Sequence, residues 1–187
     1  MRRRWAVLLA VTAVVTPGCG GTFVAEAGVP ECEASGELVA IAQAVPTARF
    51  VPCIEDFPVG WTFGGMDVRQ GRASFWMDND RVGAHSVQVT LEEACDTTGA
   101  TALPPLGQGA QRLLRIDELD ARSRGAWLHQ YNGGCVTWDF EVPSGVYDFD
   151  AFNVELETAL DFFPRTAIAD EVRRRYGADL DEVAAGA

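Results

Sequence analysis

The chain has 187 residues, of which 48% are hydrophobic and 22% are charged. This composition is ordinary for a single folded domain and excludes a disordered or collagen-like chain. Acidic residues outnumber basic ones 27 to 15, which gives a net charge of -12, and all the basic residues are arginine. Phosphate binding requires clusters of Arg and Lys, so we expect no nucleic-acid partner. The exclusive use of arginine suggests a GC-rich genome.

The first 18 residues predict an export signal. Arg2–Arg4 are basic, and the following run 6–15 is apolar but too short to span about 30 Å of hydrocarbon. The segment Thr16-Pro17-Gly18-Cys19 then resembles the lipobox of bacterial lipoproteins, although Thr16 stands where Leu is usual. This resemblance implies that Cys19 is acylated and becomes the mature N-terminus, which anchors the chain to the membrane.

An alternative is ordinary cleavage after Ala27, at the A-x-A site Ala25–Ala27, which would give a soluble secreted protein. This site lies far from the end of the apolar run, so we favour lipidation. We therefore divide the chain into a signal peptide (1–18), a short tether (19–30), one domain (31–177) and an acidic flexible tail (178–187). Cleavage before Cys19 leaves 12 basic residues against 27 acidic ones, a charge of -15 that anionic lipid headgroups would repel.

Four cysteines remain after Cys19, and an even number in an exported chain predicts two disulfides. Three pairings are possible, and sequence alone cannot choose between them. We favour Cys32–Cys53 with Cys95–Cys135, because each pair flanks a compact segment. A zinc site is disfavoured because the chain has no C-x-x-C pair and neither histidine has ligand spacing to a cysteine.

In the first half of the domain, apolar spacing predicts a helix over 37–45 that is ended by Pro46. Residues 49–54 follow as an extended segment, which Pro52 restricts to an edge or a strand end. The strongest hairpin signal joins strands 63–69 and 72–77 through Gln70-Gly71, with Met66 facing Phe75 and Val68 facing Ala73. A third strand places His85, Val87, Val89 and Leu91 on one face. Residues 96–111 read as a long loop.

In the second half, residues 112–116 predict a short strand. A second hairpin joins 125–131 to 135–142 through Asn132-Gly133, a favoured type I′ pair. A two-residue loop sets Trp127 opposite Trp138 and His129 opposite Val136, whereas a three-residue loop using Gly134 would break that match. A helical stripe then includes Phe149, Phe152, Leu156, Leu160 and Phe163 and is closed by Pro164. A last helix runs from Thr166 to Tyr176 and ends at Gly177.

Strands followed by helices predict an α+β fold. We expect an antiparallel sheet of five or six strands, built from two hairpins, covered on one face by the C-terminal helices and stapled by two disulfides.

The sequence contains no motif specific enough to predict a catalytic, cofactor-binding or metal-binding site. His85 and His129, the only histidines, would support a hydrolase if they shared a cleft with a carboxylate, but structural roles are more usual for a histidine on a strand face. Asp78–Gly83 matches only the first half of a calcium loop. Trp61, Trp76, Trp127 and Trp138 would form a sugar or peptide platform if exposed, and core packing is the favoured alternative.

Three segments are similar to a group of uncharacterised lipoprotein-like proteins of actinobacteria. They are Val51–Ile54 with Pro58–Trp61, the hairpin Asp67–Phe75, and Gly133–Thr137, and the likeness extends from about Leu38 to Tyr176. The group has no assigned activity, so the resemblance implies an exported, disulfide-bonded domain and nothing catalytic.

We therefore expect a lipid-anchored binding or accessory protein at the outer face of a bacterial cytoplasmic membrane. Its partners would be the membrane, through the lipid, and an envelope protein, and no cofactor is expected. Two alternatives remain open at this point. One is an envelope hydrolase that uses His129 or His85, and the other is a carrier with a large apolar pocket between sheet and helices.

Overall fold

The computed structural model describes residues 28–105, 109–118, 122–145 and 148–180. The signal peptide 1–18, the lipidation position Cys19 and the alternative cleavage position after Ala27 lie outside the described residues. Within the described ranges, no helix has both the length and the apolar character needed to cross a membrane.

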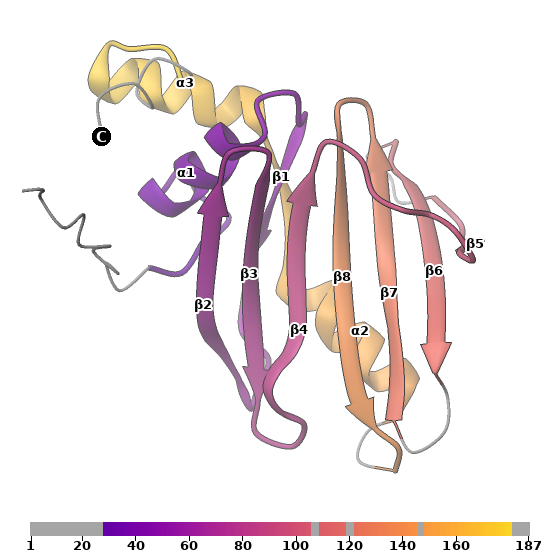
Figure 1. Cartoon of the computed structure of the whole chain (residues 1–187). Coiled ribbons are helices and arrows are strands. Elements are labelled where there is room, and N and C mark those ends of the chain that lie inside the picture. Colours follow the sequence, from indigo (N-terminus) through magenta and orange to yellow (C-terminus); the bar gives the residue numbers. More distant parts are fainter. Residues whose placement is uncertain (1–27, 106–108, 119–121, 146–147, 181–187) are drawn as a thin grey trace, which may run out of the picture.

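The domain is built on one antiparallel sheet of seven strands, shown in Figure 1. A separate two-stranded sheet and three helices complete the described architecture. In spatial order, the strands of the large sheet are β2 (Trp61–Arg69), β3 (Arg72–Asn79), β4 (Gly83–Glu92), β8 (Gly134–Pro143), β7 (Arg122–Tyr131), β6 (Gln111–Glu118) and β5 (Thr101–Ala102). The remaining elements are β1 (Phe50–Ile54), β9 (Leu160–Pro164), α1 (Gly36–Ala44), α2 (Phe149–Ala159) and α3 (Arg165–Tyr176).

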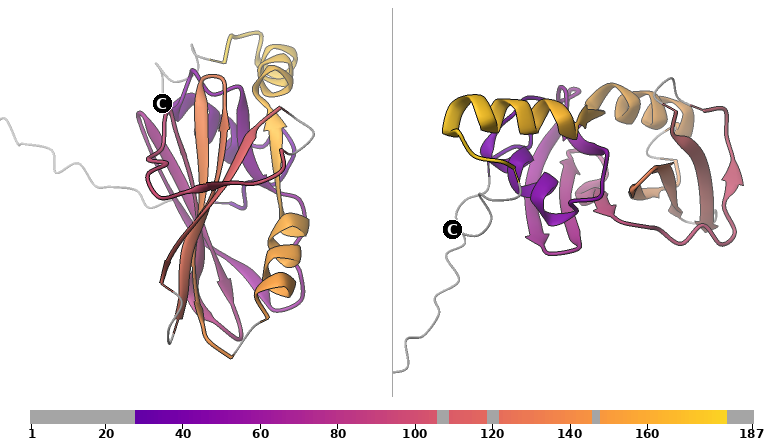
Figure 2. Two further views of the ribbon diagram at one scale, coloured as in Figure 1. Left: turned by 90° about the vertical axis from the view of Figure 1, so that its right-hand side faces the viewer. Right: turned by 90° about the horizontal axis from the view of Figure 1, so that it is seen from above.

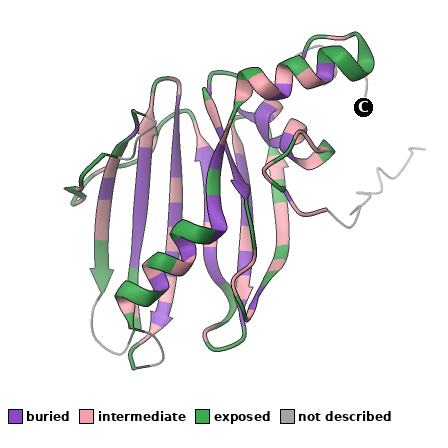
Figure 3. Cartoon of the chain, turned by 180° about the vertical axis from the view of Figure 1, so that it is seen from behind, coloured by how far each residue is buried: buried purple, intermediate pink, exposed green. Residues whose placement is uncertain are grey.

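All three helices and the small sheet cover the same face of the large sheet (Figures 2 and 3). On that face, strand pairing aligns one apolar row across six strands: Met66, Phe75, Val89, Trp138, Trp127 and Leu114. The helices bury this row with side chains at helical spacing, such as Phe152 and Leu156 of α2. The predicted α+β fold with its C-terminal helices is confirmed, with α1 as a further cover.

Both predicted hairpins form in the predicted register. Met66 pairs with Phe75 and Val68 with Ala73, while Trp127 pairs with Trp138 and His129 with Val136. The second turn has two residues, because Tyr131 pairs with Gly134. It is not a type I′ turn, however, since Gly133 has φ 86° but Asn132 does not share a positive φ.

The expectation of one helical stripe from Phe149 to Phe163 is wrong. The helix α2 ends at Ala159. The next five residues, Leu160–Pro164, form strand β9, which pairs antiparallel with β1. The burial of β9 alternates, so Phe162 is buried and Phe163 is only partly buried. These residues form a strand because their backbone groups hydrogen-bond to the edge of β1, and these hydrogen bonds outweigh the weak helical preference of the local sequence.

The predicted disulfides Cys32–Cys53 and Cys95–Cys135 are both present, with Cα–Cα distances of 4.9 and 5.7 Å. Two disulfides in one domain are typical of proteins that fold outside the cytoplasm. The first disulfide secures the chain before α1 to β1. The second secures the segment after β4, which we call the strap (residues 93–100), to β8.

The described ends of the chain belong to the packed domain. From the tether, Pro30 is buried and its carbonyl accepts a hydrogen bond from the backbone N–H of Ile54. From the expected tail, Leu180 is 4% exposed and its carbonyl accepts a hydrogen bond from the side chain of Gln43.

Candidate functional site

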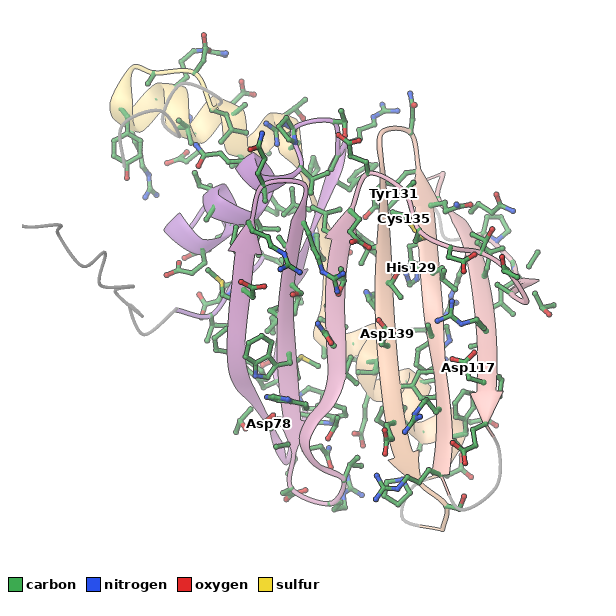
Figure 4. The ribbon with its side chains drawn as sticks, in the orientation of Figure 1. Asp78, Asp117, His129, Tyr131, Cys135 and Asp139 are labelled. Atoms are coloured by element: carbon green, nitrogen blue, oxygen red, sulfur yellow. A yellow bond between two sulfur atoms is a disulfide. The ribbon has the colours of Figure 1, made fainter. Side chains whose placement is uncertain are left out.

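Within the described part of the chain, no helix lies on the face of the large sheet opposite α1, α2 and α3, and we call this face the open face. It is the face toward the viewer in Figures 1 and 4. The strap crosses it from β4 toward β5 (Figure 1). Beneath the strap, a small satellite core forms from Cys95, Ala100, Leu113, Ala126, Leu128 and Cys135. The strap is therefore fixed to the sheet by apolar packing as well as by its disulfide.

A hollow of about 210 Å³ lies on the open face beside the strap, and we call it the open-face hollow. Its walls come from strands β3, β4, β6, β7 and β8 and from the strap. The lining residues are Arg72, Thr90, Glu92, Cys95, Asp96, Arg115, Leu128, Thr137 and Asp139.

Strand register explains how these distant residues meet. Thr90 pairs with Thr137 on β8, and Thr137 pairs with Leu128 on β7, so the three form one row across the sheet. The adjacent row on the same face contains Asp139, Ala126 and Arg115. Because Ala126 between them is small, Arg115 can extend toward Asp139, whose position on β8 is labelled in Figure 4.

The two arginines of the hollow already have acidic partners. Arg72 Nη1 lies 3.2 Å from Glu92 Oε1, and Arg115 Nε lies 3.1 Å from Asp117 Oδ1. Arg115 also donates to the strap, through a 3.3 Å hydrogen bond to the carbonyl of Asp96. Each guanidinium charge is thus largely balanced before any ligand enters.

Asp139 is the exception in this hollow. Its nearest cation is Arg115, whose Nη2 lies 3.9 Å from Asp139 Oδ1, beyond hydrogen-bond distance, and among the described residues its carboxylate makes no hydrogen bond. Partial burial raises the pKa of Asp139 above its ordinary value, against the opposing charges of Arg115 and Arg72. The Asp139 side chain is 48% exposed, so water still reaches its carboxylate, and it shares its nearest cation, Arg115, with Asp117.

Thr90 is the second unsatisfied group of the hollow. The residue is only 3% exposed, and its Oγ1 has no hydrogen-bond partner among the described residues. A buried hydroxyl without a partner loses roughly 1–3 kcal/mol relative to a satisfied one. Such a group beside an open hollow is typical of a position that a ligand or an ordered water completes.

The two histidines do not share a site. His129 is fully buried on the helix side of the sheet, where Trp138 and Phe162 pack against its ring at 4.3 and 5.1 Å. Burial, with the nearby charge of Arg112, lowers its pKa to about 3, so it is neutral at pH 7. Neither ring nitrogen has a hydrogen-bond partner among the described residues, and no carboxylate orients it as a base.

His85 lies on the opposite face of the sheet from His129. The expectation that His85 shares a face with Val87, Val89 and Leu91 is therefore wrong. His85 has a positive φ of 55°, its side chain is exposed, and its ring packs against Trp76 at 5.0 Å. The backbone turns here because the N–H of His85 donates to Asp78 Oδ1 at 2.7 Å. The hydrolase hypothesis therefore has no shared cleft to support it.

The other sequence candidates also have structural roles. Asn79 Oδ1 accepts from the backbone N–H groups of Arg81 and Val82, so the partial calcium motif forms a turn between β3 and β4. Among the described residues, no three His, Cys, Asp or Glu side chains are grouped to hold a metal. Trp61, Trp127 and Trp138 are core residues, whereas Trp76 is partly exposed on the open face.

Two further hollows lie at the surface. One, of about 360 Å³, is lined by Cys32, Phe57 and four acidic side chains; the other, of about 390 Å³, lies on the far side of the strap near Gln111, Gln130 and Asn132. Between sheet and helices, where an apolar carrier would hold its cargo, Phe75, Trp127, Trp138 and Phe152 are fully buried against one another. The open-face hollow is lined by the unpartnered hydroxyl of Thr90 together with the carboxylate of Asp139. The hollow near Gln111 is lined by the hydroxyl of Tyr131, which is also buried and without a partner among the described residues, but it has no carboxylate of this kind beside it.

Comparisons with known proteins do not assign a family. No family model and no curated protein matches the chain. A solved structure from Bacteroides thetaiotaomicron is similar with a TM-score of 0.36 and 12% identity, over 73% of this chain and 62% of that one. The present chain thus spans less than two thirds of the length of that structure, and a similarity at this level carries no functional argument.

Proposed function

We propose that this chain is an exported binding protein of the bacterial cell envelope, held at the outer face of the cytoplasmic membrane by a lipid on Cys19, and that it binds a small polar ligand in the open-face hollow. The observation that carries the binding role is the combination of Thr90 and Asp139. A hydroxyl and a carboxylate, both without hydrogen-bond partners among the described residues, line one hollow in which acidic groups outnumber arginines. The lipobox resemblance supports the anchor, and the two disulfides support folding outside the cytoplasm.

The hollow is held rigidly, which favours binding over a mobile catalytic cleft. Its floor is formed by paired strands, and its wall is the strap, which the Cys95–Cys135 disulfide and the Arg115–Asp96 hydrogen bond fix to the sheet. A preformed polar site loses little conformational entropy when its ligand enters.

Native mass spectrometry of the protein purified from membranes of its own host tests both parts of the proposal. We expect a mass that includes an acyl modification at Cys19 and a noncovalent small molecule that is released on denaturation. The variant Thr137→Trp, which fills the hollow, should lose the small molecule, whereas Thr62→Trp, at an exposed position on β2, should retain it. An unmodified Cys19 would contradict the anchor, and retention of the small molecule by Thr137→Trp would contradict the site.

A further inference from the structure

The open-face hollow has an imbalance of charge that points to the kind of ligand it accepts. It contains two arginines and three acidic residues, and Asp117 lies at its border as a partner of Arg115. Glu92 and Asp117 balance the two arginines. The carboxylate of Asp96 caps the strap by accepting from the backbone N–H of Thr98 at 2.9 Å. Asp139 has only a long ion pair with Arg115, at 3.9 Å, and it shares that arginine with Asp117, so the acidic groups in and beside the hollow exceed the arginines four to two.

The two unsatisfied groups are close enough to contact one ligand. Thr90 pairs with Thr137, which lies two residues from Asp139 on β8, so Thr90 and Asp139 are diagonal neighbours on one face of adjacent strands. Diagonal neighbours in an antiparallel pair have Cα atoms about 7–8 Å apart. A single small group between them can therefore contact both side chains.

The chemistry of these two groups selects a cation. A carboxylate can only accept hydrogen bonds, and a threonine hydroxyl can accept as well as donate. An anion would have to displace Glu92 or Asp117 from its arginine and would be repelled by Asp139. A neutral hydroxyl satisfies the hydrogen bonds but leaves the excess negative charge of the hollow uncompensated, and hydrogen bonds to charged groups are stronger when both partners are charged.

We propose that the open-face hollow binds the primary ammonium group of a small organic amine, with the carboxylate of Asp139 as counterion and the hydroxyl of Thr90 as a hydrogen-bond acceptor. This inference rests on the binding role proposed above and specifies its ligand class. The hollow of about 210 Å³ restricts the bound part of the ligand to a small group.

Three five-carbon compounds of matched length test this proposal: 1,5-diaminopentane, pentane-1,5-diol and glutarate. Each is titrated into the isotopically labelled full domain at pH 7.5 and low ionic strength, and the backbone amide shifts of Leu128 and Thr137 are followed by NMR. We expect the diamine to shift these amides saturably, whereas the diol and glutarate leave them unchanged. The diamine affinity should fall about tenfold or more in Asp139→Asn and about threefold or more in Thr90→Val.

The control variant is Asp67→Asn, which removes one charge from the open face outside the hollow, where Asp67 lies near Arg69. Its diamine affinity should stay within about twofold of wild type, since exposed charges at this distance are screened. Saturable shifts with the diol or glutarate, but not with the diamine, would overturn the ammonium assignment while leaving a polar-ligand site in place. Saturable binding of none of the three would overturn both the assignment and the proposed site, and equal loss of affinity in Asp67→Asn and Asp139→Asn would overturn the role of Asp139.

Discussion

At the scale of single residues, His129 is the side chain whose environment is furthest from its ordinary one. It is a core residue between Trp138 and Phe162, with a pKa lowered to about 3 by burial and by Arg112. In the unfolded chain its pKa is about 6.5. Above pH 6.5 both states are neutral, so the stability is fully present. Between about pH 6.5 and about 3 only the unfolded chain binds the proton, and stability is lost as the pH falls.

We therefore expect the free energy of unfolding to decrease by up to about 1.4 kcal/mol per pH unit over this window, as a contribution from His129. The variant His129→Phe should have a shallower dependence, because it removes the titrating group and leaves no unpaired ring nitrogen in the core. Urea unfolding at several values between pH 7 and pH 4 measures the slopes. The exposed His85 provides the control, and an equally shallow slope in His85→Gln would contradict this account.

Gly64 and Gly65 together allow Trp76 to lie against the edge strand β2, and Gly64 makes the closer approach. A Cβ atom at position 64 would be 2.4 Å from Cδ1 of Trp76, and Gly64 lies at the irregularity where the pairing of β2 with β3 shifts register. Gly64→Ala should therefore displace the indole and destabilise the domain by about 1–3 kcal/mol. Tryptophan fluorescence and thermal unfolding report the two effects. The matched substitution Gly36→Ala, where nothing lies within 4 Å of the new Cβ, should leave both unchanged or raise stability slightly.

At the scale of elements, sequence periodicity predicts what is local and fails where an element depends on a distant partner. The hairpins β2–β3 and β7–β8 follow from alternation and a turn glycine, and their registers are those predicted. Leu160 and Phe163 continue the helical spacing of apolar residues, yet Leu160–Pro164 form β9 because they pair with β1. A local sequence pattern does not include this partner, since β1 lies more than 100 residues earlier in the chain. The short strand β5 within the expected loop 96–111 has the same cause, since it exists only through its pairing with β6.

The strap is held by one disulfide in addition to its apolar packing and its hydrogen bond from Arg115. The Cys95–Cys135 disulfide closes a separation of 40 residues, and its removal in the double variant Cys95→Ser/Cys135→Ser should cost roughly 3–4 kcal/mol of unfolding free energy. It should also expose Leu128, which is 1% exposed beneath the strap, and weaken binding in the open-face hollow. Chemical denaturation measures the first effect and hydrogen exchange at the Leu128 amide the second.

The double variant Cys32→Ser/Cys53→Ser is the matched control for the strap. It removes a disulfide with a sequence separation of 21 residues at the other end of the domain, so it should lower the free energy of unfolding slightly less. The difference between the free energy of exchange at the Leu128 amide and the free energy of global unfolding should stay unchanged. If both double variants expose Leu128 alike, the strap is not an independent element.

At the scale of the whole molecule, the open-face hollow could not be derived from the sequence, although most of the strands that form it could. Its lining residues extend from Arg72 to Asp139 along the chain. They meet because β4 pairs with β8, which places Thr90 next to Thr137, and no local pattern encodes that pairing of non-consecutive strands. The sequence shows which catalytic motifs it lacks, whereas the position of Asp139, which shares Arg115 with Asp117 and makes no hydrogen bond among the described residues, becomes clear only from the structure.

The boundary of the folded unit is likewise a property of the whole molecule. Sequence pattern places the end of the domain at Gly177, where α3 ends in a left-handed residue, but Leu180 folds back into the core and bonds to Gln43 of α1. A fragment spanning residues 28–180 should therefore be more stable than one spanning 28–177 by roughly 1.5–3 kcal/mol, the contribution of one buried leucine. Urea unfolding of the two fragments measures the difference, and Leu180→Ala in the longer fragment should reproduce most of it. Asp179→Asn, which removes only the exposed ion pair with Arg173, should change stability by less than about 1 kcal/mol, and equal stability of the two fragments would place the domain boundary back at Gly177.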